Sequence, residues 1–323
     1  MSLKLICASI KKYNNFLITA HTNLEGDALG AELAFYALIR KLGKRGIILN
    51  ADSIPCGLDF LPGIKKIRKL DRSSPYLKFD CLVVLDCADL KRSGEVWRLN
   101  KSNKPILNID HHISNQGFGD AHWVDAHASS CSEMIYQLYK QMRLPISKPE
   151  AIAMYTGMMT DTGSFRYSNT TRFTHQAVAD LLKFDINVPL IYRNVYENLA
   201  LAETKLLIKL LSKIVFSMQG KIAYFKLKRN MLKDGVISMD LGDQLLSFAR
   251  AIKGVEVVAL FKESIAGKNQ VRINLRSQGK VDVNKIAAFF GGGGHKTASG
   301  CTLHGKMNQV IKNVLVKIQQ SFK

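Results

Sequence analysis

The alternation of short apolar runs with helical patterns is the feature that most constrains the fold of this chain. The runs are FLITA (16–20), GIILNA (46–51), CLVVLD (81–86) and ILNID (106–110). Between the first two runs, apolar side chains recur at helical spacing, and Gly43 stands where that helix would end. Near-continuous apolar strands separated by helices predict an α/β fold with a doubly wound, mainly parallel sheet covered on both faces.

Further helices are predicted downstream of these runs. Residues 129–142 and 149–161 carry helical patterns, and Ser130 with Glu133 makes a capping box at the start of the first of them. Residues 188–210 read as one or two connecting helices. We therefore expect a helical segment to follow the parallel sheet.

The pattern changes after this segment. The chain continues with a hairpin turning at Gln219-Gly220, a second strand pair, a short helix, the stretch GGGGHKTASG and a closing amphipathic helix. A length of 323 residues suits two domains. The predicted organisation is a first domain over 1–187, a helical linker over 188–210 and a smaller α+β domain over 211–323.

Several classes of protein are disfavoured by composition. No apolar run approaches the roughly 18–20 residues that a membrane-spanning helix needs, and the N-terminus lacks the pattern of a signal peptide. The six cysteines show no CxxC spacing, and several fall in apolar strand-like runs. They are typical of reduced core thiols, so we expect a cytoplasmic protein without a membrane partner.

The positive charge is concentrated toward the C-terminus. Of the net charge of +20, residues 1–210 contribute +7 and the shorter segment 211–323 contributes +13. A basic C-terminal third indicates a polyanionic partner such as nucleic acid or a nucleotide. A generally basic proteome explains the charge equally well, so charge alone leaves both interpretations open.

Acids and imidazoles follow the ends of the predicted strands. In a doubly wound sheet the carboxyl ends of the strands form the ligand-binding edge. The side chains expected there are His21, Glu25, Asp27, Asp86, Asp110, His111, His112 and Asp161. Each acid has a structural explanation when taken singly: Asp27 as a first-turn helix residue, Asp86 as a loop cap and Asp161 as a turn residue.

Together, these side chains are better explained by bound metal. Five carboxylates packed side by side would repel one another, and divalent cations remove that repulsion. Imidazole and carboxylate without thiolate suit Mn²⁺ best, and the number of ligands indicates two bridged ions. Such a pair activates water and stabilises the attacking and leaving oxygens at phosphorus, so the pattern predicts phosphoester hydrolysis.

The motifs resemble those of the DHH phosphoesterases, whose name matches Asp110-His111-His112. HTNLEGDALG, VVLDCAD, NIDHH and YTGMMTDTGSFRYSNTT look like the four motifs of that family in order, and VRINLRSQGKVDVNKIAAFFGGGGHKTASG resembles its DHH-associated domain. The two-domain length is most similar to the nanoRNase and pAp-phosphatase branch. That branch trims very short oligonucleotides and dephosphorylates 3′-phosphoadenosine 5′-phosphate (pAp).

The resemblance implies roles for the site residues. One metal would be held by His21, Glu25 and Asp86, and the other by Asp27, Asp86, His111 and Asp161, with Asp86 bridging. His112 would donate a hydrogen bond or a proton beside the scissile phosphate, and Asp110 would orient its neighbours. The chain departs from the family at position 25, where Asp is usual and Glu25 stands here, which puts its ligand role in question.

Basic and glycine residues of the second domain suggest a phosphate clamp. Glycines allow close backbone approach, so amides near Gly293 and Gly294 could face a phosphate, with Arg272, Arg276 and His295 beside them. An ordinary flexible loop is the alternative for GGGGH. In the first domain, Arg166 could contact a phosphate or only pack its loop.

We therefore predict a two-metal hydrolase for short oligonucleotides and pAp. A phosphodiesterase for cyclic or linear dinucleotides such as c-di-AMP or pApA would carry the same motifs. A non-catalytic RNA-binding module fits the charge, although every metal position holds a competent ligand. The resemblance admits a homodimer, which no residue pattern requires.

Overall fold

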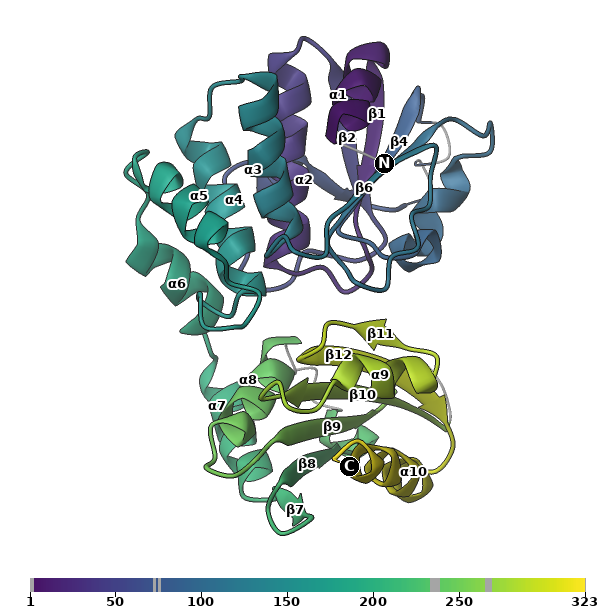
Figure 1. Cartoon of the computed structure of the whole chain (residues 1–323), viewed down its shortest axis with the longest axis vertical. Coiled ribbons are helices and arrows are strands. Elements are labelled where there is room, and N and C mark those ends of the chain that lie inside the picture. The colour runs from purple at the N-terminus through teal and green to yellow at the C-terminus, as the bar shows by residue number, and fades with distance from the viewer. Residues whose placement is uncertain (1–2, 72–73, 75–76, 233–238, 265–268, 323) are drawn as a thin grey trace. The chain divides into compact units, whose positions relative to one another are not determined.

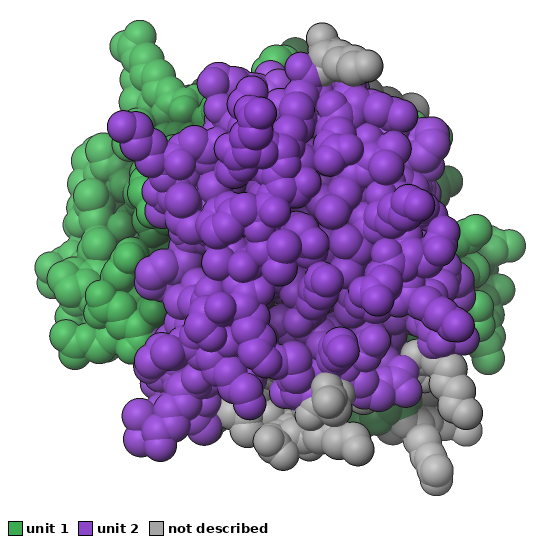
Figure 2. Space-filling view, turned by 90° about the horizontal axis from the view of Figure 1, so that it is seen from below, with its two compact units in different colours: residues 1–197 green, residues 198–323 purple. Residues whose placement is uncertain are grey.

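The computed structural model describes residues 3–71, 74, 77–232, 239–264 and 269–322. The chain separates into two compact units, residues 1–197 and 198–323, which Figure 2 colours separately. The division falls inside the segment 188–210 that the sequence predicts to be a linker. Among the described helices, none combines the length and the apolar character that crossing a membrane requires.

The first unit is an α/β unit that begins with a helix. Its helices and strands are α1 (Leu3–Lys12), β1 (Asn15–Thr19), α2 (Gly26–Lys41), β2 (Arg45–Asn50), η1 (Ile64–Lys66), β3 (Ile67–Lys69), β4 (Cys81–Leu85), η3 (Leu90–Leu99), β5 (Ile106–Asp110), β6 (Ala121–Val124), α3 (Cys131–Met142), α4 (Lys148–Asp161), α5 (Arg172–Leu182) and α6 (Val188–Tyr196). Figure 1 labels most of them.

The six strands of this unit form one parallel sheet. Their order is β3-β2-β1-β4-β5-β6, and every neighbouring pair runs parallel. The chain first builds outward from β1 to β3 and then returns to the other side of β1 with β4. This reversal creates a switch point between β1 and β4, where a doubly wound sheet binds ligands at its carboxyl edge.

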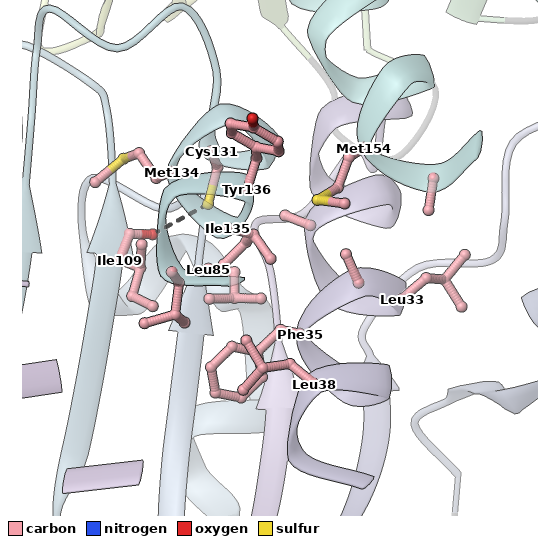
Figure 3. Close-up of a cluster of buried hydrophobic side chains, with 14 of the residues drawn as sticks. Leu33, Phe35, Leu38, Leu85, Ile109, Cys131, Met134, Ile135, Tyr136 and Met154 are labelled. Carbon is pink, nitrogen blue, oxygen red and sulfur yellow. Dashed lines mark hydrogen bonds between the residues drawn. The ribbon is translucent and has the colours of Figure 1, made fainter. Parts of the chain in front are cut away.

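Buried side chains cover both faces of the sheet. Phe16, Ile18 and Val83 belong to the large core formed with the helices, and Leu17 and Val84 belong to a smaller core on the opposite face. The alternation follows from the two-residue repeat of a strand. Figure 3 shows the larger core, where Cys131 at the start of α3 donates through Sγ to the carbonyl of Ile109 at 3.4 Å.

Helices α2 and α4 cross at very short range because glycine lines the crossing. A Cβ added at Gly30 would lie 2.4 Å from the carbonyl oxygen of Ala153, and one at Gly157 would lie 2.0 Å from Ser132 Oγ and 2.7 Å from Asp27 Oδ1. These distances exclude any larger residue without a shift of the backbone. The close crossing brings the first turn of α2 against the start of α3.

The second unit is a mixed sheet between two helical layers. Its elements are α7 (Leu201–Leu211), β7 (Val215–Ser217), β8 (Ile222–Leu227), η4 (Arg229–Leu232), α8 (Met239–Arg250), β9 (Val257–Glu263), β10 (Gln270–Ser277), α9 (Val283–Phe289), β11 (Gly293–Gly294), β12 (Ala298–His304) and α10 (Met307–Gln320). The strand order is β11-β12-β10-β9-β8-β7, in which only the described pair β8 and β9 is parallel.

The predicted fold class is confirmed, and the local predictions differ from the structure at several elements. The two edge strands β3 and β6 and the helices α1, α5 and α8 were not predicted. Ser130 Oγ accepts from the backbone N–H of Glu133 at 3.0 Å, but the Glu133 carboxylate accepts from Ser129 and Thr174 instead of closing a capping box. Strand β12 was not expected, because its small residues carry no strand pattern. Seven residue pairs with β10 define it instead.

Candidate metal centre

The predicted ligands of the first unit meet where its central strands end. His21 follows β1, Asp86 follows β4, and Asp110 ends β5 with His111 directly after it. Asp86 has a positive φ of 51°, a left-handed conformation that Asp tolerates better than most residues. The chain turns sharply there and keeps the carboxylate at the edge of the sheet.

Asp86 lies at the centre of this group. Its Oδ2 is 3.3 Å from Nε2 of His21, and its Oδ1 is 3.4 Å from Nε2 of His111 and 3.6 Å from Nδ1 of His112. The Asp86 side chain is 1% exposed. One buried carboxylate therefore contacts three imidazoles, one oxygen facing His21 and the other facing the histidine pair.

Backbone carbonyls fix the orientation of two of these rings. Nδ1 of His21 lies 2.7 Å from the carbonyl oxygen of Thr22, and Nδ1 of His111 lies 3.3 Å from that of Ala128. A carbonyl accepts only, so Nδ1 carries a hydrogen in both rings and Nε2 is the nitrogen that faces the carboxylates. Histidine ligands of metals are oriented in this way.

Asp27 is held by the N-terminus of α3. Its Oδ2 accepts from the backbone N–H of Cys131 at 2.6 Å and its Oδ1 from that of Ser132 at 2.8 Å. The same Oδ2 lies 3.8 Å from Nε2 of His111. Asp27 thus has a structural role that the sequence does not reveal, and it still faces the cluster.

Two further acids lie at the margin of the cluster. Asp161, the last residue of α4, places Oδ2 3.4 Å from Nε2 of His111 and is 15% exposed. Glu25 precedes α2 as its N-cap and places Oε1 3.7 Å from Nε2 of His21. The Glu25 side chain is 52% exposed, so it is the most accessible acid of the group.

His112 is paired with Asp110. Its Nδ1 lies 2.7 Å from Asp110 Oδ1, and both residues are buried. The carboxylate of Asp110 therefore accepts the Nδ1 hydrogen and holds the ring. This pair was predicted as the catalytic pair, and the structure brings its members into contact.

The charges of the cluster shift the pKa values of its members strongly. Burial lowers the pKa of His21 and His111, but nearby carboxylates outweigh it and raise both pKa values well above the usual range of an imidazole. The carboxylates are Asp86 and Glu25 for His21, and Asp161 and Asp86 for His111. Burial also raises the pKa of Asp27 to about 7, with the Asp86 charge adding to the effect. Shifts of this size are typical of functional sites.

The donor set fits divalent metal. Nε2 of His21, both oxygens of Asp86 and Oδ2 of Asp161 are buried and make no hydrogen bond to the residues that the structure describes, although such atoms are normally satisfied in folded proteins. Asp86 belongs to three groups of described ligand atoms that lie within 4.8 Å of one another: with His21 and Glu25, with Asp27 and His111, and with Asp110 and His112. Shared by all three, Asp86 is suited to bridge two ions.

A buried acid behind the site was missed by the sequence analysis. Glu32 of α2 is fully buried and accepts from Asn50 Nδ2 at 2.8 Å, while Asn50 Oδ1 accepts from the backbone N–H of Ala20 at 3.1 Å. This link fixes the backbone directly before His21, beyond the last pairing of β1. A Glu inside an otherwise small and apolar helix stretch was the only signal in the sequence.

The predicted substrate-binding arginines contact the protein itself. In the second unit, Arg276 donates through its NH2 nitrogen to Asp243 Oδ1 at 2.6 Å, and Arg272 lies exposed on the same strand. In the first unit, Arg166 donates through Nε to the carbonyl of Gly163 at 2.7 Å. The role of these arginines as a clamp stays a prediction.

The glycine stretch forms a tight hairpin. Gly293 and Gly294 pair with β12, and the backbone of His295 exchanges two hydrogen bonds with Ala298. Gly294 has a φ of +141°, and a Cβ at Gly292 would lie 2.1 Å from the carbonyl oxygen of Gly300. Packing against β12 therefore requires glycine at these two positions.

Comparisons with known proteins agree with this architecture. Residues 15–158 match the model of the DHH family, N-terminal domain, and residues 219–323 match that of the DHHA1 domain. The first match contains the predicted ligands from His21 to His111 and the predicted catalytic His112, and Asp161 lies three residues beyond it. The two models correspond to the two units of the chain.

Curated relatives and a solved structure match nearly the whole length. The "Bifunctional oligoribonuclease and PAP phosphatase NrnA" of Bacillus subtilis is 27% identical, over 92% of this chain and 91% of that protein. The "Uncharacterized protein MG371 homolog" of Mycoplasma pneumoniae is 30% identical, over 97% and 93%. The crystal structure of an exopolyphosphatase-related protein from Bacteroides fragilis is 28% identical with a TM-score of 0.87, over 98% and 95%. The chain therefore belongs to the DHH/DHHA1 family of phosphoesterases.

Proposed function

We propose that this phosphoesterase hydrolyses oligonucleotides of a few residues to mononucleotides and removes the 3′-phosphate of pAp. The observation that carries the proposal is the buried cluster around Asp86 in a chain that also has a DHHA1 unit. Support for the substrate class comes from the similarity to the Bacillus subtilis oligoribonuclease and PAP phosphatase over nine-tenths of both chains.

The ligand atoms are proposed to hold two divalent ions. His21, Glu25 and Asp86 would hold one, and Asp27, Asp86, His111 and Asp161 the other. When bound, such a pair polarises a phosphoryl oxygen and lowers the pKa of water. Oxygen and imidazole donors without thiolate favour Mn²⁺.

The protein supplies orientation and proton transfer around these ions. Thr22 and Ala128 keep Nε2 of His21 and His111 turned toward Asp86. His112 is proposed to act on the leaving oxygen of the substrate, as a hydrogen-bond donor or acid. Asp110, 2.7 Å from Nδ1 of His112, stabilises the ring when it is protonated.

The second unit is proposed to bind a terminal phosphate or base of the substrate. Arg276 and Arg272 provide guanidinium groups, which suit bidentate contact with phosphate. The +13 charge of residues 211–323 favours a polyanion. The proposal requires that phosphate displace Asp243 from Arg276.

A substrate panel tests the proposal. The enzyme with Mn²⁺ would be given pAp, 5′-labelled RNA and DNA oligomers of two to about twenty-four nucleotides, pApA and c-di-AMP. We expect phosphate from pAp and the fastest mononucleotide release from the two- to five-mers. Preferential cleavage of c-di-AMP would replace the proposal with a cyclic-dinucleotide phosphodiesterase, and RNA binding without turnover would indicate a binding module.

Metal titration tests the ion count separately. Because the pKa values of His21 and His111 are raised well above their usual range, both rings carry protons near neutral pH that a metal must displace. Calorimetry in buffers of different ionisation enthalpy should show two Mn²⁺ per chain with proton release. Binding of a single ion, or binding without proton release, would contradict the assignment.

A further inference from the structure

Asn115 is not a predicted ligand, but it contacts both Asp110 and the turn that carries Asp86. Its Nδ2 is 2.7 Å from Asp110 Oδ2, 2.8 Å from Asn108 Oδ1 and 3.2 Å from the carbonyl oxygen of Cys87. Its Oδ1 accepts from the backbone N–H of Gly117 at 2.7 Å. The Gly117 bond decides which end of the amide is the donor, because only the oxygen can accept it.

The carboxylate of Asp110 is held from two sides. Oδ1 lies 2.7 Å from Nδ1 of His112, and Oδ2 accepts from Asn115 at the same distance. Asp110 is fully buried, so these contacts define the plane of the carboxylate. A carboxylate free to rotate would no longer keep the His112 ring in one orientation.

The neighbouring amide of Asn108 extends the contact to the turn of Asp86. Asn108 Nδ2 lies 3.2 Å from the carbonyl oxygens of both Val84 and Cys87, which flank the left-handed residue Asp86. Pairing between β4 and β5 ends at Leu85. The two amides therefore satisfy the Cys87 carbonyl that the sheet no longer reaches.

We propose that Asn115 is a positioning residue that fixes Asp110, and through it His112, relative to Asp86. It donates to the carboxylate that orients the ring, and together with Asn108 it braces the turn that presents the central carboxylate. The proposed role needs no contact between Asn115 and substrate, because the described hydrogen bonds of its side chain all go to protein groups. The inference rests on the proposed hydrolysis for its kinetic consequences, but the hydrogen-bond geometry can be tested without substrate.

Kinetics of Asn115→Ala give the first test. Changes in residues that orient site groups cost about 10- to 100-fold in activity or metal affinity, so we expect kcat to fall by that range while KM changes less than about twofold. Asn100→Ala is the matched control. Asn100 also bridges a loop of the first unit through its amide, to Lys104 at 2.7 Å, away from the cluster. The kcat of the Asn100→Ala variant should equal that of the unchanged protein.

A double-mutant cycle separates positioning from general loosening. If Asn115 acts through Asp110, adding Asn115→Ala to Asp110→Ala should lower kcat little further. Multiplicative losses, or equal losses in the Asn100 control, would overturn the proposal.

Proton NMR of the Mg²⁺-loaded full chain gives a readout independent of turnover. The Nδ1 hydrogen of His112, held by Asp110, should give a protected resonance that exchanges faster in Asn115→Ala and is unchanged in Asn100→Ala. An unchanged resonance in Asn115→Ala would overturn the proposal. If no substrate of the panel is cleaved, the proposed function fails while this resonance still decides the role of Asn115.

Discussion

The two units place their predicted functional side chains in opposite situations. In the first unit most of the predicted ligands are buried, and several of their atoms make no hydrogen bond within the part of the chain that the structure describes: Nε2 of His21 and both oxygens of Asp86 are examples. In the second unit Arg276 is already paired, with Asp243 at 2.6 Å. One set of groups is therefore prepared for a ligand, and the other set must exchange a partner to bind one.

This difference reflects what each kind of ligand demands. A metal site must have its donors fixed in advance, because carboxylates gathered without a partner repel one another. A phosphate clamp can keep its charge satisfied by a half-exposed acid such as Asp243 until substrate arrives. The proposed metal binding in the first unit would thus be set by the fold, and the proposed phosphate binding in the second by competition between anions.

The largest effect is expected at Asp86. Asp86→Asn keeps the size of the side chain and tolerates the left-handed backbone, but removes the charge that faces His21 and His111. Activity should fall by more than about 100-fold, beyond the loss typical of residues that only orient ligands. Tryptophan fluorescence should stay unchanged, and Asp185→Asn, at a fully exposed position with a similar φ of 52°, serves as the matched control. Near-normal turnover would contradict the two-metal site.

Hydrogen exchange with and without Mn²⁺ compares the units directly. At about 100 times Kd, a ligand stabilises its site by about 2.7 kcal/mol, which corresponds to about 100-fold slower exchange. We expect this protection at Cys131 and Ser132, whose N–H groups hold Asp27. Amides of β10 and β12 should exchange as before. Equal protection in both units would contradict the expectation that Mn²⁺ binds to the first unit alone.

Changes at Arg276 and its partner sharpen the comparison in the second unit. Loss of a hydrogen bond to a charged group costs about 1.5–3 kcal/mol, so Arg276→Ala should raise KM for nucleotides about 10-fold or more and leave an artificial phosphodiester unaffected. Asp243→Ala should lower KM by at most about fivefold, because an exposed pair contributes about 1 kcal/mol or less. A rise in KM for Asp243→Ala would show that Asp243 assists binding.

A pH dependence of stability, with no effect on substrate binding, is expected at Glu32. Burial raises its pKa from an ordinary 4.5 to about 8, so between these values the folded carboxyl keeps a proton that the unfolded chain loses, and stability falls as pH rises. Glu32→Gln lacks this slope, which reaches about 1.4 kcal/mol per pH unit. Relative to the unchanged protein it should gain stability from pH 5 to 8.

Urea unfolding of the metal-free protein measures this difference. Both tryptophans, Trp97 and Trp123, lie in the first unit and report on it alone. Glu95→Gln removes a charge from a side chain that is 63% exposed, and provides the control. The prediction would be contradicted if the free energy of unfolding changed with pH in the same way for Glu32→Gln and for the unchanged protein.

The sheet and the edge it offers could be predicted from the sequence because both depend on local patterns. Apolar runs mark β1, β2, β4 and β5. The residues just after the strands, such as His21 and Asp86, must lie at the carboxyl edge of the sheet because the strands are parallel. The supports could not be predicted in the same way. Asp27 meets the start of α3 104 residues further along, and Arg276 meets Asp243 through folding of the second unit.

The exposure of Glu25 bears on how freely this site can change over evolutionary time. Asp27 faces the cluster and also caps the N-terminus of α3, so a longer side chain there would disturb two structures at once. Glu25 has no hydrogen-bonded partner among the described contacts of its carboxylate, and half of its side chain faces solvent. An added methylene meets little resistance at position 25. Of the acids in the cluster, the one at position 25 can therefore be lengthened from aspartate to glutamate with the least disturbance of its surroundings.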